Sequence, residues 1–193
     1  MLWTILTSGI AAQAADIVLL ARGQASAWAD PAIGTFYRTG ALMGGAGVVV
    51  DVFGPISADL DVAYKRANPA LDPSDDSTRF ELVPVTLFAE YNFKFANAPV
   101  LPFAGLGFAM VQFAERHAPM PDGRTVTRGM RPAIELRTGV RVDLGLVPGS
   151  LMRTGPVKSI DLEVFGGRRL EMPGGMGFNL SAWRAGLGLG VRL

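Results

Sequence analysis

The one histidine of the chain lies where a general base could work. His117 sits in the polar segment Glu115-Arg116-His117-Ala118-Pro119. An imidazole can activate a serine hydroxyl near neutral pH, as a lipid-modifying enzyme would require. The sequence places no serine beside it, so we interpret His117 as a solvated loop residue and predict no catalytic residue.

Two further patterns could bind small ligands. Three aspartates crowd Asp72–Ser77, and oxygen-rich loops can bind calcium or bridge to lipopolysaccharide through divalent ions. They lack the spacing of an EF-hand, which favours a solvated acidic loop. Gly186, Gly188 and Gly190 are spaced two apart, whereas a phosphate-binding loop needs a strand-to-helix turn. We therefore predict no metal and no cofactor.

A more specific pattern is the alternation from Ile134 to Leu144. Its even-numbered residues are apolar apart from one threonine, and its odd-numbered residues are charged apart from one glycine. Successive strand residues point to opposite faces, whereas a helix could not separate the residues in this way. The segment is therefore predicted to be a strand between an apolar and a polar medium.

The same alternation recurs in about eight segments, which is near the strand count of the smallest barrels. They are Ile17–Trp28, Phe36–Val52, Ile56–Lys65, Val83–Phe93, Gly105–Met110, Ile134–Leu144, Ser159–Gly167 and Trp183–Leu193.

The connections between these segments alternate in length. Short turns at Gly54-Pro55 and Ala96–Pro99 alternate with long polar stretches at Asn68–Ser77 and Glu115–Arg128, and a medium turn follows at Pro148–Pro156. Outer-membrane barrels have short periplasmic turns and longer external loops. With an even number of strands, both termini are expected on the short-turn, periplasmic side.

The composition favours a membrane protein without spanning helices. Of the 193 residues, 49% are hydrophobic and 18% charged, against about 25% charged in soluble domains. No uninterrupted apolar run reaches the ~18 residues of a spanning helix. A net charge of +1 without a basic stripe gives no reason to expect nucleic acid, and the lack of cysteine excludes disulfides. The chain is predicted to be all-β, a single antiparallel up-and-down transmembrane β-barrel of about eight strands over residues 15–193.

The first 14 residues are expected to be a signal peptide. Leu2–Ile10 is apolar, and Ala12-Gln13-Ala14 offers small residues at a cleavage site. No lysine or arginine precedes the apolar stretch. The alternative is that these residues begin the first strand.

The polar face of the predicted strands carries charges of both signs in nearly equal number. An eight-stranded barrel is only wide enough for its own side chains, so we expect these charges to pair across the lumen and close it, with glycines leaving room for long side chains. Glu163, Arg168 and Arg169 could suggest a separate carboxylate–guanidinium site, but lumen packing explains the inward members. The predicted lumen charge network comprises Asp51, Asp59, Asp61, Lys65, Glu90, Glu135, Arg137, Arg141, Asp143, Asp161, Glu163, Arg169, Arg184 and Arg192.

Aromatic rings are expected at the borders of the apolar band, where they meet lipid headgroups. The predicted interfacial aromatics are Tyr64, Tyr91, Phe93 and Trp183. The rival arrangement is a soluble lipocalin-type barrel, with an apolar cavity inside and the charges outside. The polar face is diluted by glycine and alanine, which favours the membrane arrangement.

With these strands in place, the chain resembles the small outer-membrane β-barrels of Gram-negative bacteria, the OmpA/OmpX/OmpW-like group. The resemblance covers about Ile17–Leu193, and its most local element is the last strand, in which Leu193 replaces the usual terminal aromatic residue. The residues that match the assembly signal of such proteins are Arg184, Gly186, Leu189 and Val191.

The resemblance implies an outer-membrane location, with outer-membrane lipid, the barrel-assembly machinery and other envelope proteins as partners. It supplies no catalytic residue. The leading hypothesis is a non-enzymatic structural or interaction component, an anchor in the cell envelope. The alternative is a narrow channel for small or hydrophobic solutes; a lipocalin-like carrier and a lipid-modifying enzyme are the remaining hypotheses.

Overall fold

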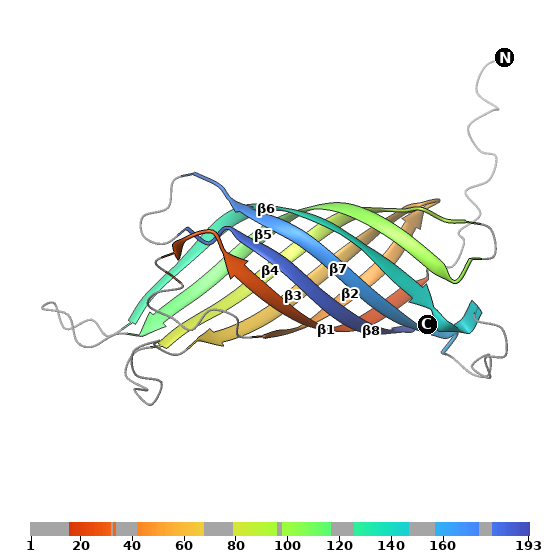
Figure 1. Ribbon diagram of the computed structural model, residues 1–193, viewed down its shortest axis with the longest axis horizontal. Coiled ribbons are helices and arrows are strands. Elements are labelled where there is room, and N and C mark those ends of the chain that lie inside the picture. The colour runs from red at the N-terminus through yellow and green to blue at the C-terminus, as the bar shows by residue number, and fades with distance from the viewer. Residues whose placement is uncertain are drawn as a thin grey trace, which may run out of the picture.

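The computed structural model describes residues 16–31, 33, 42–67, 79–95, 98–116, 126–146, 157–173 and 179–193. Eight antiparallel strands in sequence order close into one barrel (Figure 1). This confirms the predicted fold class. The strands are β1 (Ile17–Trp28), β2 (Met43–Phe53), β3 (Ile56–Ala67), β4 (Arg79–Asn92), β5 (Val100–Arg116), β6 (Val126–Asp143), β7 (Ser159–Glu171) and β8 (Ala182–Arg192).

The barrel closes between its first and last strands. β1 pairs with β8 along its length, from Val18 opposite Arg192 to Trp28 opposite Ala182. The amide of Leu193 also donates to the Ile17 carbonyl at 2.9 Å. The start of β1 and the end of β8 therefore lie together, at the same end as the tight turn where Gly54 takes a positive φ of 56°. We call this the short-turn end and the opposite end the long-loop end.

The two faces of the wall are divided as a membrane barrel requires. Outward residues are apolar and exposed, such as Leu187 at 64% and Leu162 at 43%, whereas Arg137 and Glu163 face inward and are 3% and 1% exposed. A lipocalin-type barrel would have the opposite orientation. The lipocalin-type alternative is therefore wrong for this chain.

Several strand limits differ from the predicted ones. β2 begins at Met43, and residues 36–41 of the predicted segment Phe36–Val52 lie outside the described part of the chain. β5 and β6 pair as far as Arg116–Val126, although a polar connection was expected over Glu115–Arg128. In this part of the wall polar side chains point outward, so its composition resembles that of a loop.

β6 also ends one residue earlier than predicted. Leu144 begins a short 3-10 helix, Leu144–Leu146. The Asp143 carboxylate accepts a hydrogen bond from the Gly145 amide at 2.8 Å. This contact turns the chain away from the sheet because it replaces a ladder hydrogen bond with a local one. Within the described residues, no helix has the length and apolar character needed to cross a bilayer.

Candidate functional site: the barrel lumen

A balanced layer of ion pairs crosses the middle of the lumen. We call it the central charge layer; each of its side chains is at most 4% exposed. Six strands contribute to it, β1, β3, β4, β6, β7 and β8, so residues distant in the sequence meet inside the barrel. Its guanidinium groups belong to Arg22, Arg137, Arg141, Arg169 and Arg184, and its carboxylates to Asp59, Asp61, Glu90, Glu135 and Glu163.

Arg22 of β1 binds three carboxylates on β3 and β7. Its Nε lies 2.9 Å from Glu163 Oε1, its Nη2 2.6 Å from Asp59 Oδ2, and its Nη1 3.1 Å from Asp61 Oδ1. Its guanidinium donates five hydrogen bonds to Asp59, Asp61 and Glu163, as the planar fork of a guanidinium allows. Arg22 therefore links β1 with β3 and β7 across the lumen.

Arg137 and Arg141 of β6 bind carboxylates of the same group. Arg137 bonds both Asp59 and Glu90, while Arg141 lies 2.7 Å from Glu90 Oε2 and 2.7 Å from Glu163 Oε2. Each charged group that these three arginines bring together therefore has more than one partner of opposite sign. This is the condition under which buried ions are tolerated.

Inward phenylalanines pack against these guanidinium groups. The Arg137 guanidinium carbon lies 3.9 Å from the ring centroid of Phe88, and that of Arg141 lies 4.3 Å from the centroid of Phe103. Such cation–π contacts add attraction where water is excluded. They also fill the space that the ion pairs leave.

Glu135 anchors the part of the layer nearer the long-loop end. It pairs with Arg169 at 2.9 Å and with Arg184, and Arg184 also bonds Gln24 and lies 3.4 Å from Asp61. This second cluster shares Asp61 with Arg22. The two clusters thus form one continuous network.

Glycines leave room for these long side chains, as the sequence suggested. A methyl group on Gly47 would overlap Arg22 Nη1, and one on Gly107 would come within 2.6 Å of the Phe88 ring. Both glycines are on the inner face, where the neighbouring strand carries a large side chain. A larger residue would displace Arg22 at the first position and Phe88 at the second.

Four of the predicted network residues lie nearer the short-turn end. Asp161 is buried and pairs with Arg192 at 2.8 Å, and Asp143 lies 3.7 Å from the same arginine. Asp51 is only partly buried and pairs with the exposed Lys94 at 3.3 Å. These ion pairs lie on the short-turn side of the central charge layer and are separate from it.

The lumen is largely apolar at the long-loop end, contrary to the expectation of a charged interior throughout. Most inward positions beyond the charge layer carry large apolar or small residues, and Trp28 and Phe113 pack against them. The inward Arg131 of β6 also lies at this end and pairs with Glu171 of β7. We call this group the apolar cluster. Its buried members are Ile33, Ala67, Phe80, Leu82, Ala109, Val111, Ala133 and Leu180.

Lys65 is the predicted network residue that the structure leaves outside any ion pair. Its side chain is 2% exposed, and among the described residues none accepts a hydrogen bond from its Nζ. The ammonium lies 5.1 Å from the ring centroid of Trp28. It therefore sits between the charge layer and the apolar cluster, held by a cation–π contact.

Sequence reasoning missed Arg22 and Gln24 of β1. The segment Ile17–Trp28 was identified, but its inward face begins with Val18 and Leu20, which pack with Val49 in a small apolar group. The alternation of Arg22, Gln24 and Ser26 was the signal that could have found them.

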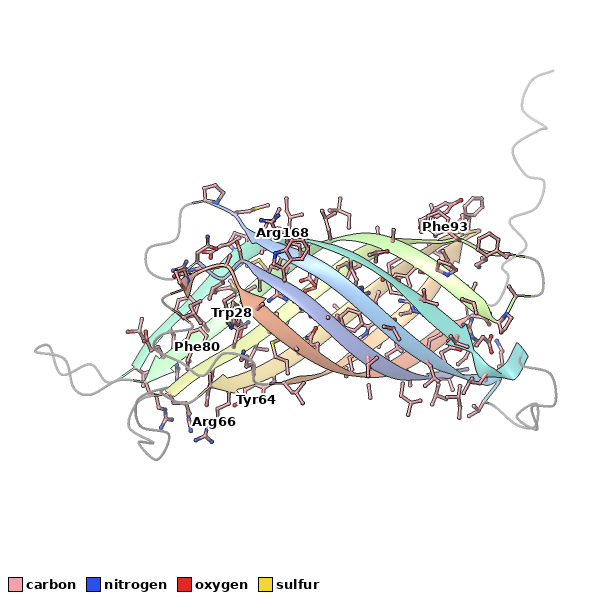
Figure 2. All side chains as sticks on the ribbon, viewed as in Figure 1. Trp28, Tyr64, Arg66, Phe80, Phe93 and Arg168 are labelled. Carbon is pink, nitrogen blue, oxygen red and sulfur yellow. The ribbon has the colours of Figure 1, made fainter. Side chains whose placement is uncertain are left out.

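Glu163, Arg168 and Arg169 do not form a common site. Glu163 pairs with Arg22 and Arg141, and Arg169 pairs with Glu135. Arg168 points outward, 5.0 Å from the ring centroid of Trp183 (Figure 2). The alternation of strand β7 separates the adjacent arginines onto opposite faces.

The four predicted interfacial aromatics all point outward. Tyr64, Tyr91, Phe93 and Trp183 are exposed, and Tyr91 packs edge-on against Phe93. Phe93 and Tyr64 lie toward opposite ends of the barrel (Figure 2).

Some sequence features fall outside the described residues, namely residues 1–14, Asp72–Ser77 and His117. Within the described ranges, no group of three or more potential metal ligands is found.

Comparisons with known proteins bear on the fold. No protein-family model and no curated protein sequence matches the chain. Among solved structures, the N-terminal β-barrel domain of Pseudomonas aeruginosa OprF is similar, with a TM-score of 0.57, 13% identity and coverage of 92% of this chain and 97% of that one. Neisserial surface protein A has a TM-score of 0.55 and 15% identity, with 93% of this chain and 96% of that one covered. Ail of Yersinia pestis, in complex with a heparin analogue, has a TM-score of 0.54 and 8% identity, with 93% of this chain and 97% of that one covered. The chain therefore has the fold of the small outer-membrane β-barrel proteins.

Proposed function

We propose that this protein is an outer-membrane β-barrel with a closed lumen, acting as a non-enzymatic structural or interaction component of the cell envelope. The membrane location is supported by the exposed apolar outer face and by the fold it shares with outer-membrane barrels. Outward aromatics at both ends, including Tyr64, Tyr91, Phe93 and Trp183, would lie at the two headgroup layers.

The observation that carries the closed lumen is the central charge layer. Arg22, Arg137 and Arg141 pair with carboxylates on other strands, and the apolar cluster and the buried Arg131–Glu171 pair lie beyond them. An ion passing through would have to break several buried ion pairs and then enter an apolar region. Both steps oppose conduction.

A non-enzymatic role is supported by the state of the buried titratable groups. The carboxylates of the layer are engaged by guanidinium groups, which leaves them poorly placed to move protons to a substrate. An unaltered lipid profile in cells carrying His117→Ala would agree with this role, whereas loss of a lipid modification would contradict it.

Planar-bilayer recording of the full-length protein tests the closed lumen. We expect no reproducible conductance from the unmodified protein. Conductance that disappears on changing Arg137 or Glu135 would overturn the proposal in favour of the narrow channel. The proposed partners are outer-membrane lipid, other envelope proteins and the barrel-assembly machinery, which would recognise the last strand, β8.

A further inference from the structure

The outer face carries an excess of positive charge at the long-loop end. Outward strand positions there hold five arginines and, among the described residues, one glutamate; they are Arg66, Arg79, Arg116, Arg128, Arg168 and Glu81. At the short-turn end the exposed lysines are neutralised, since Lys94 pairs with Asp51 and Lys158 with Asp16. The wall is therefore electrostatically asymmetric.

Four of these arginines are brought together by the register of β3 to β6. Arg66 lies opposite Glu81, Glu81 opposite Ala114, and Ala114 opposite Arg128. In the next outward row Arg79 lies directly opposite Arg116. Paired strands are about 4.8 Å apart, and like charges directly opposite each other destabilise a sheet.

The one acid in this patch is already engaged. Glu81 pairs with Arg79 at 2.9 Å. Arg116 and Arg128 are exposed, and neither forms an ion pair with any residue that the structure describes. The patch therefore has unmatched positive charge that an external anion could neutralise.

A groove of about 590 Å³ opens on the wall within this patch. Arg128, Glu81 and Gln112 supply its polar margin, while Val83, Ala114 and Met130 supply apolar walls. The volume suits part of an amphiphile better than a hydrated ion.

We propose that this groove binds the anionic headgroup of a phosphorylated glycolipid in the membrane leaflet at the long-loop end. Arg128, which lines the groove, and Arg116, in the next outward row, hold the phosphate oxygens, and an acyl chain follows Val83 and Met130 along the wall. Charge complementarity favours this occupant, because guanidinium groups bind phosphate through paired, charge-assisted hydrogen bonds. The inference rests on the proposed membrane placement, with the long loops facing outward.

The test uses the full-length barrel in detergent, titrated with diphosphoryl lipid A and followed by native mass spectrometry. We expect Arg116→Gln/Arg128→Gln to weaken binding roughly tenfold, the loss of about 1.4 kcal/mol of charge-assisted hydrogen bonding. Lys94→Gln removes one positive charge at the other end and should change binding less than about twofold. Equal binding by the double variant and the unmodified protein would overturn the proposal.

Two further arms separate the lipid from other anions. Ala114→Trp fills the groove without altering charge, so it should weaken lipid A binding and leave binding of inorganic pyrophosphate unchanged. If a sulfated sugar binds as tightly as lipid A and Ala114→Trp has no effect, the site takes a soluble polyanion and the lipid assignment is wrong.

Folding is checked independently by heat-modifiable migration on a gel, which closed barrels show. An unmodified protein without this behaviour would refute the membrane barrel itself, whereas a folded barrel without lipid selectivity would refute only the groove. If the double variant does not fold, the single variants Arg128→Lys and Arg128→Gln replace it. Lipid A binding should be retained in Arg128→Lys, which keeps the positive charge, and weakened in Arg128→Gln, which removes it.

Discussion

Different forces hold the two halves of the lumen together. Around Arg137 the inner wall is tied by directional bonds between opposite charges on strands far apart. Around Leu82 it is held by contacts among apolar side chains. In the charge layer, removing one group leaves others uncompensated, whereas in the apolar cluster a loss stays local. A barrel interior can therefore combine a polar network with an ordinary hydrophobic core.

The largest loss of stability is expected from Arg137→Ala in the central charge layer. It leaves five carboxylates facing four guanidinium groups, with Asp59 and Glu90 undercompensated, and we expect the free energy of unfolding to fall by about 3–5 kcal/mol. Urea unfolding in detergent, followed by tryptophan fluorescence, measures it. The outward Arg168→Ala is the control and should cost at most about 1 kcal/mol. Equal losses would show that the layer does not depend on charge balance.

In the apolar cluster, Leu82→Ala tests the hydrophobic half. Leu82 is fully buried, so the cavity and lost contacts should reduce the free energy of unfolding by about 3 kcal/mol. The matched control is Leu87→Ala on the same strand, which faces outward and should have a smaller effect. If both variants lose the same stability, the cluster does not act as a core.

A smaller effect is expected from Gly47→Ala, which adds a methyl group against the Arg22 guanidinium. Displacing Arg22 should cost about 1–3 kcal/mol in the same unfolding measurement. Gly44→Ala on the same strand serves as the control, because its added methyl group meets no described atom within 4 Å. A tolerated Gly47→Ala would mean that Arg22 can move without loss of its ion pairs.

The boundary between the two halves is tested by Lys65→Met. This change removes a buried ammonium that donates no hydrogen bond to any described residue, and it keeps most of the volume, so stability should stay the same or rise by about 1 kcal/mol. Thermal unfolding in detergent reports the sign. A fall of more than about 1 kcal/mol would instead show that the contact with Trp28 stabilises the barrel.

The fold followed closely from the sequence because strand alternation is a local property. The limits of β1 and the turn at Gly54 agree with the structure, and the outward and inward faces are those predicted. The extension of β5 and β6 was missed because polar residues face outward there, so Gln112 and Arg128 resemble loop residues. The apolar cluster was missed because the inward side was expected to be charged along its whole length.

The sequence by itself determined which side chains face inward and that positive and negative charges would nearly balance there. Only the tertiary structure decided which of them meet. Arg22 and Glu163 are 141 positions apart, and Arg184 and Gln24 are 160 apart. Such pairs depend on the register with which the closed barrel brings distant strands across the lumen, and alternation along a single strand carries no information about that register.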